Sequence, residues 1–166
     1  MLALLNLLAI LASGLAGPPP DRGPWLAIRP AEFVTVEIHP DGGWRVLDRG
    51  PAEPADDRAE QAMSGLLGGA PTPPKAELPT ARPDTVRFVL KPTARGMMLL
   101  VSNGYGRRLE YRGVLRRQAE GRPEPSSVCP VLGRLQGIED WPYPFAELDV
   151  GAFQLVEETR QPMVCR

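Results

Sequence analysis

Short segments in which apolar and polar residues alternate recur along this chain, separated by residues that favour turns. Residues 33–39 place Val34, Val36 and Ile38 on one face and polar side chains on the other, the period-two pattern of a half-buried strand. The Pro-Asp-Gly-Gly sequence at 40–43 suits a tight turn, and extended character resumes at 44–47. This region therefore predicts a β-hairpin.

The alternation continues toward the C-terminus. Further strands are expected at 86–90, 97–101, 108–116, 128–131 and 153–156, with a short edge strand at 25–28. Residues 97–101 are uninterruptedly apolar, as in a central strand covered on both faces, and Asn103-Gly104 is a strong hairpin signal. About seven short strands predict a mainly β fold, an antiparallel β-sandwich with an immunoglobulin-like topology as one option.

One segment has helical rather than strand periodicity. Residues 56–67 carry apolar side chains at i, i+3, i+4, i+7 and i+8, which form a single stripe made of Ala59, Ala62, Met63, Leu66 and Leu67. This predicts one short amphipathic helix on the rim or face of the sheet. The proline-rich residues 70–83 are expected to form an exposed loop within a single β-rich domain at 25–166.

The first sixteen residues form an almost unbroken apolar run without a charged side chain, followed by Gly17 and three prolines. This pattern predicts a signal peptide at 1–16, cleaved after Ala16, and a proline-rich leader at 17–24. The run is shorter than the roughly 20 residues that span a bilayer, and an uncleaved membrane anchor is the alternative. No membrane span is expected after signal cleavage.

The composition indicates the kind of organism and the cellular location. Lys75 and Lys91 are the only lysines among 19 basic residues, and such a bias toward arginine is typical of a GC-rich bacterial genome. Together with the predicted signal peptide, it indicates a periplasmic or secreted protein. The net charge of −1 argues against nucleic acid as a partner, because nucleic-acid binding usually requires a clear basic excess.

The chain contains two cysteines, Cys129 and Cys165. In an oxidising compartment they are expected to form a disulfide, closing a loop of about 36 residues that contributes roughly 4 kcal/mol by chain entropy. A metal site is the weaker alternative, because the only histidine, His39, is distant in sequence. The sequence predicts neither a metal ion nor a cofactor.

Residues 99–105, with Leu109-Glu110-Tyr111 after them, resemble the middle hairpin of many small exported immunoglobulin-like domains of bacteria. The resemblance implies a β-sandwich fold. It contains no functional motif, so it implies no activity.

Three arginines are the first candidate binding residues. Arg108, Arg112 and Arg116 are expected to project from one face of a single strand, at intervals of about 13 Å. That spacing suits the carboxylates, sulfates or phosphates of an anionic envelope polymer. The alternative is that these arginines form a solvated outer face that discourages edge-to-edge aggregation. Glu110 lies among them and weakens the positive electrostatic field of the row.

The aromatic and proline residues at 141–145 are the second candidate. Trp141 and Tyr143 could form a rigid platform for a sugar or a protein partner. The alternative is that this segment closes one end of the core inside the disulfide loop.

Catalytic signals are weak. His39 shares a strand face with Glu37 and precedes Asp41, an arrangement compatible with an acid–base or metal site, but a histidine beside a turn is usually exposed. No nucleophile motif occurs, so no catalytic residue is predicted. The sequence thus predicts a non-catalytic envelope or secreted binding module. An envelope-acting hydrolase of unfamiliar type and a structural accessory subunit of an envelope complex are the alternatives.

Overall fold

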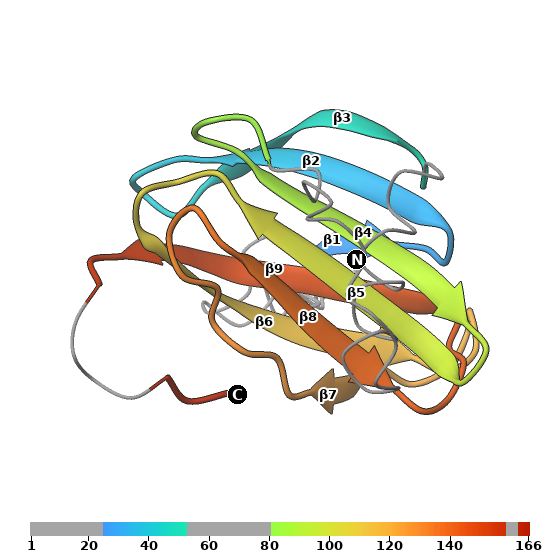
Figure 1. The fold of residues 1–166 in the computed structure, drawn as a ribbon. Helices are drawn as coiled ribbons and strands as arrows, with labels where there is room; N and C mark the ends of the chain where they lie inside the picture. Colours follow the sequence, from blue (N-terminus) through green and yellow to red (C-terminus); the bar gives the residue numbers. More distant parts are fainter. Residues whose placement is uncertain (1–24, 53–80, 159–162) are drawn as a thin grey trace, which may run out of the picture.

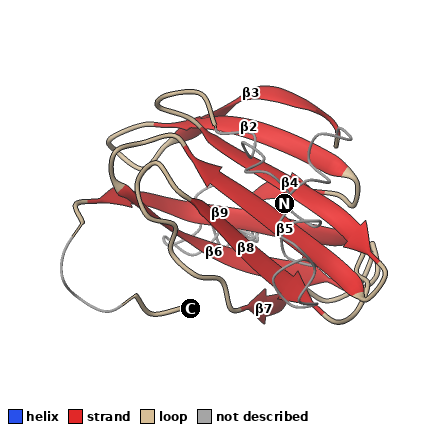
Figure 2. Cartoon of the chain, viewed as in Figure 1, coloured by secondary structure: helices blue, strands red, loops and turns tan. Residues whose placement is uncertain are grey.

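The computed structural model of this protein describes residues 25–52, 81–158 and 163–166. In this part of the chain two antiparallel sheets pack face to face (Figure 1). Strands, turns and loops account for all of these residues, and none of them is helical (Figure 2). The prediction of a mainly β, sandwich-like architecture is therefore confirmed. None of the described residues belongs to a helix long and apolar enough to cross a membrane.

The smaller sheet has four strands in the order β1-β9-β6-β7. Its central strands are β9 (Glu147–Val156) and β6 (Arg108–Arg116), and its edges are β1 (Leu26–Ile28) and β7 (Glu124–Ser126). The edge strand expected at the start of the domain is thus present as β1.

The larger sheet has five strands in the order β3-β2-β4-β5-β8. They are β3 (Trp44–Pro51), β2 (Glu32–Ile38), β4 (Val86–Thr93), β5 (Gly96–Asn103) and β8 (Gln136–Trp141). Strands β3 and β4 both pair antiparallel with β2, so they run parallel to each other on either side of it.

Two local predictions are confirmed. The β2–β3 hairpin closes with a hydrogen bond from the His39 N–H to the Gly43 carbonyl at 2.7 Å, and Gly42 has φ of 84°, a left-handed conformation that glycine adopts without a steric penalty. Strand β5 is central in its sheet, and its residues from Met97 to Asn103 are buried on both faces.

The hairpin expected at Asn103-Gly104 is wrong. Strand β5 belongs to the five-stranded sheet and β6 to the four-stranded sheet, so this turn carries the chain from one sheet to the other. The Asn103 side chain accepts a hydrogen bond from the Tyr105 N–H and donates to carbonyls of Arg107 and Val131, while the Gly104 N–H donates to Thr85. These contacts beyond the turn replace the pairing of a hairpin.

Two other predictions near the C-terminus need correction. Residues 128–131 contribute only an isolated bridge between Val131 and Leu109, not a strand. The sequence did not predict the additional strands β7 and β8. Both strands are short or half-exposed, and such strands lack the regular alternation that identifies a buried one.

The core fills the space between the two inner faces. The Phe88 ring from β4 packs against Tyr111 of β6 and Phe153 of β9, with ring centroids 5.8 Å apart in both pairs. The predicted disulfide between Cys129 and Cys165 is present. The predicted signal peptide, leader and helix, and most of the predicted loop at 70–83, lie outside the described residues.

Candidate functional site

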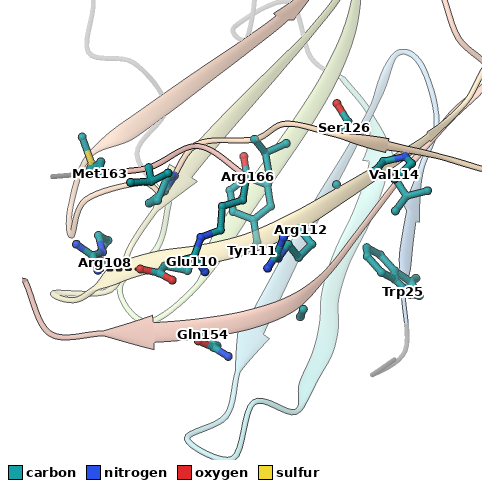
Figure 3. Close-up of a pocket in the computed structure, with 16 residues that line it drawn as sticks. Trp25, Arg108, Glu110, Tyr111, Arg112, Val114, Ser126, Gln154, Met163 and Arg166 are labelled. Carbon is teal, nitrogen blue, oxygen red and sulfur yellow. Dashed lines mark hydrogen bonds and ion pairs between the residues drawn. The ribbon is translucent and has the colours of Figure 1, made fainter. Parts of the chain in front are cut away.

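A groove with a volume of about 740 Å³ crosses the outer face of the four-stranded sheet. Outward-facing residues of β6 and β9 line it, together with Trp25 and the C-terminal residues 163–166. Figure 3 shows Trp25 at one end and Met163 at the other, with Arg112 and Arg166 between them. The groove thus brings together parts of the chain that are far apart in sequence.

A β-bulge in β9 shapes the lining of this groove. The pairing between β6 and β9 shifts register between Glu110 and Arg112, and Ala152 has φ of 53°. The neighbouring Gly151 allows Trp25 to approach closely, because a Cβ at this position would lie only 3.0 Å from the indole ring. The bulge and the glycine together place an aromatic ring against the outer face of the sheet.

The C-terminal segment supplies part of the lining, and two kinds of link hold it. Cys165 is bonded to Cys129, and the backbones of Val128 and Arg166 exchange hydrogen bonds of 2.8 and 2.9 Å. A disulfide indicates a non-reducing compartment, in agreement with a location outside the cytoplasm.

Arg108 is buried beside the groove. Its Nη2 atom lies 2.7 Å from a carboxylate oxygen of Glu110, and its side chain is 10% exposed (Figure 3). The buried Nε–H of Arg108 has no hydrogen-bond acceptor among the described residues. A buried donor without an acceptor is rare in folded proteins, so the oxygen of a ligand or a water molecule would stabilise this side chain.

Arg112 and Arg166 give the groove lining more positive than negative charge. Both are exposed and line the groove, and within the described ranges neither makes an ion pair. Glu110 is the single acidic residue in the described lining, and it is already paired with Arg108. The groove therefore has a net positive charge.

Arg116, the third predicted arginine, does not belong to the described groove lining. Its guanidinium group lies 3.0 Å from the Asp149 carboxylate and 3.5 Å from that of Glu147. The predicted row is thus divided: Arg108 and Arg112 line the groove, and Arg116 pairs with acids of the neighbouring strand β9.

Tyr111 lies on the inner side of the same strand and contributes to the groove lining. Burial raises the pKa of its phenol above the ordinary value, and the nearby Glu139 carboxylate raises this pKa further. The group therefore stays protonated at neutral pH. Its oxygen has no hydrogen-bond partner in the described part of the chain.

The structure places the two predicted aromatic residues away from the groove. Trp141 is buried, packs edge-on against Phe145, and donates its indole N–H to the Ser126 hydroxyl at 2.9 Å. Tyr143 is half-buried, and the Arg117 guanidinium lies 4.5 Å from its ring centroid. These contacts favour the alternative in which the segment closes the core.

The residues around His39 line a second hollow, of about 620 Å³, at the β2–β3 turn. His39 and Asp41 are exposed there, while Glu37 forms an ion pair with Arg45. Among the residues that the structure describes, no three His, Cys, Asp or Glu side chains are grouped as metal ligands would be.

Sequence reasoning missed most of the groove lining, including Trp25, Gln154 and Arg166. The disulfide contained a signal for one of them, because pairing Cys165 with Cys129 necessarily brings Arg166 to the same place. The positions of Trp25 and Gln154 depend on the pairing of β1 and β6 with β9, which the sequence does not specify.

No protein-family model matches this chain, and searches of curated proteins and of solved structures found no significant match.

Proposed function

We propose that this protein is a non-catalytic binding module of the bacterial periplasm or exterior, and that its groove binds an anionic envelope polymer. The predicted signal peptide and the disulfide support this location. The predicted helix belongs to the same proposed exported domain.

The observation that carries the proposal is the positive charge of the groove. Arg112 and Arg166 line it without an ion pair among the described residues, and the buried Nε–H of Arg108 lacks an acceptor. Carboxylate, sulfate and phosphate oxygens are the preferred acceptors of guanidinium donors. The lining residues extend from Met163 at one end to Trp25 at the other (Figure 3), and such an extended surface suits successive units of a polymer better than one small molecule.

The catalytic alternative has less support. A hydrolase needs an acid, a base or a nucleophile in contact with its substrate. The described groove lining contains one carboxylate, that of Glu110, and its pairing with Arg108 suits a positioning role. His39 lies at the separate hollow beside the β2–β3 turn.

The test is the binding of an acidic polysaccharide, alginate, to the oxidised protein at low salt, with neutral dextran as the reference polymer. Arg112→Glu should weaken alginate binding about tenfold or more, because it removes a donor and adds a repelling charge. Arg95→Glu is the matched control, since Arg95 is exposed at the β4–β5 turn and makes the same charge change away from the groove.

Arg95→Glu should change the affinity by less than about twofold, as a distant and screened surface charge does. If both variants weakened alginate binding equally, the overall charge of the protein, not the groove, would account for the binding. No binding of alginate, dextran sulfate or a polyphosphate by the unmodified protein would overturn the proposal.

A further inference from the structure

Trp25 lies beside Arg112 on the outer face of the four-stranded sheet. Leu26 of β1 pairs with Val150 of β9, and this pairing brings Trp25 to the level of Gly151. Gly151 in turn lies directly opposite Arg112 of β6. Trp25, Gly151 and Arg112 therefore form a row across three neighbouring segments of the chain.

The indole of Trp25 lies flat over Gly151. Residues opposite each other in an antiparallel pair share a face, so a Cβ at Gly151 would point to the same side as Arg112. This Cβ would lie 3.0, 3.3 and 3.5 Å from the Cε3, Cδ2 and Cζ3 atoms of the indole. Nearly equal distances to adjacent ring atoms indicate contact with the face of the ring, not with its edge. The backbone thus covers one face of the indole.

The other face of the indole points away from the sheet. Trp25 is half-buried and lies at one end of the groove (Figure 3). Among the described residues, no other aromatic ring and no guanidinium group stacks on it. This second face is therefore the part of Trp25 that a ligand can contact.

The chemistry of an exposed indole face favours sugars over bare anions. The face of an aromatic ring carries the negative part of its quadrupole. It attracts the weakly positive C–H groups on the flat side of a sugar ring, and it repels phosphate or sulfate groups. The anionic part of a stacked ligand must lie beside the ring, where Arg112 offers two parallel N–H donors to a carboxylate.

Gln154 adds a neutral hydrogen-bonding group to the groove. It is exposed, lines the groove and lies opposite Glu110 on the neighbouring strand. Its amide both donates and accepts hydrogen bonds, as sugar hydroxyls do, whereas a fully ionised phosphate or sulfate offers acceptors alone. An aromatic face, an amide and guanidinium groups together match a sugar that carries a carboxylate.

We propose that the ligand of the groove is a polysaccharide that contains uronic acids, the sugars that carry a carboxylate. One sugar ring stacks on the outer face of Trp25, and its carboxylate binds the Arg112 guanidinium. Gln154 binds hydroxyl groups of the same polymer. This inference rests on the proposed function of the groove, and it names the class of polymer that binds there.

The test compares an alginate hexamer with a linear polyphosphate of similar charge, using the full-length oxidised protein at low salt. Trp25→Ala should weaken binding of the hexamer about fivefold to tenfold, because the stacked ring is lost. Its affinity for polyphosphate should change by less than about twofold, since phosphate does not stack. Trp25→Phe keeps an aromatic face and should bind the hexamer within about threefold of the unmodified protein.

Two further variants serve as controls. Leu135→Ala removes an exposed apolar side chain outside the described groove lining and should leave both affinities unchanged. Arg112→Glu should weaken the binding of both ligands, because both are anions.

Tryptophan fluorescence gives a second measurement that does not require Trp25→Ala to fold. The alginate hexamer should shield part of the emission of the unmodified protein from quenching by acrylamide, and polyphosphate should not. Trp25→Phe should abolish this shielding. Trp44→Phe should retain it, because Trp44 packs against the core and is not part of the described groove lining.

The outcomes separate this inference from the proposed function. The inference alone is overturned if Arg112→Glu weakens hexamer binding but Trp25→Ala does not, or if the hexamer gives no shielding. It is also overturned if Trp25→Ala weakens the binding of both ligands equally, or if the protein binds polyphosphate but not alginate. If the unmodified protein binds neither alginate, dextran sulfate nor polyphosphate, the proposed function is overturned as well.

Discussion

The outer faces of the two sheets differ although both sheets are antiparallel along their paired strands. On the four-stranded sheet the outer face carries arginines, a glutamate and a glutamine around an open groove. On the five-stranded sheet it carries Phe33, Val89 and Leu100, which are buried. The inner faces of both sheets are apolar, so the difference in surface chemistry between the sheets lies on their outer faces.

The number of apolar faces of a sheet determines how many layers must pack on it. A sheet with one apolar face needs one partner layer, and a sheet with two apolar faces needs two. The four-stranded sheet packs its inner face on the other sheet and leaves a charged outer surface exposed. The five-stranded sheet has a second apolar face, on which Phe33, Val89 and Leu100 are buried.

The sharpest test of this contrast is one substitution made on each outer face. Val89→Asp should destabilise the protein by about 3–5 kcal/mol, because Val89 is 1% exposed and the new carboxylate would lose its hydration within the apolar cluster of Phe33 and Leu100. Val114→Asp, on a central strand of the other sheet and lining the groove, should cost under about 1 kcal/mol. Urea unfolding measures both values, and equal losses would contradict the contrast.

Removing the disulfide should have the next largest effect. The double variant Cys129→Ser, Cys165→Ser should lose about 2–4 kcal/mol of stability, because the unfolded chain gains freedom. It should also bind alginate more weakly, because the segment that holds Arg166 at the groove is no longer tied. Binding by the folded variant is measured at a temperature below its unfolding transition, and unchanged affinity would show that the C-terminal segment is not part of the site.

The smallest expected effect concerns the bulge in the groove. Ala152→Gly should stabilise the protein by up to about 1 kcal/mol, because alanine at φ of 53° is disfavoured and glycine is not. Ala27→Gly in β1, where the backbone is that of an ordinary strand, should instead destabilise it by about 0.5–1 kcal/mol. Urea unfolding measures both changes in stability, and their difference reports the cost of the left-handed backbone at Ala152. Similar losses of stability in the two variants would contradict a strained bulge.

The predictable parts of this fold are those in which local chemistry decides the outcome. The β2–β3 hairpin follows from alternation on both sides of a Pro-Asp-Gly-Gly turn, and β5 follows from an apolar run too long to leave a face exposed. The turn at Asn103-Gly104 shows the limit. Its residues specify a reversal of the chain, but the choice between a hairpin and a crossing to the other sheet depends on partners such as Thr85 and Val131.

The candidate site likewise has a part that the sequence predicts and a part that depends on tertiary contacts. Period-two alternation correctly places Arg108 and Arg112 on one side of β6, and the cysteine count correctly pairs Cys129 with Cys165. The ion pair of Arg116 with Asp149 depends on which strand lies beside β6, and so does the position of Trp25. Sequence alternation assigns a face to each residue, but the neighbours on that face come from the sheet topology.

The disulfide has a consequence for when the proposed site comes into being. The segment bearing Arg166 is covalently fixed only after Cys165 has been oxidised to its disulfide with Cys129. A newly made copy in a reducing compartment would therefore display an incomplete groove. Maturation of the proposed site would then coincide with entry into a non-reducing compartment, and full affinity for the proposed anionic polymer would appear only after that step.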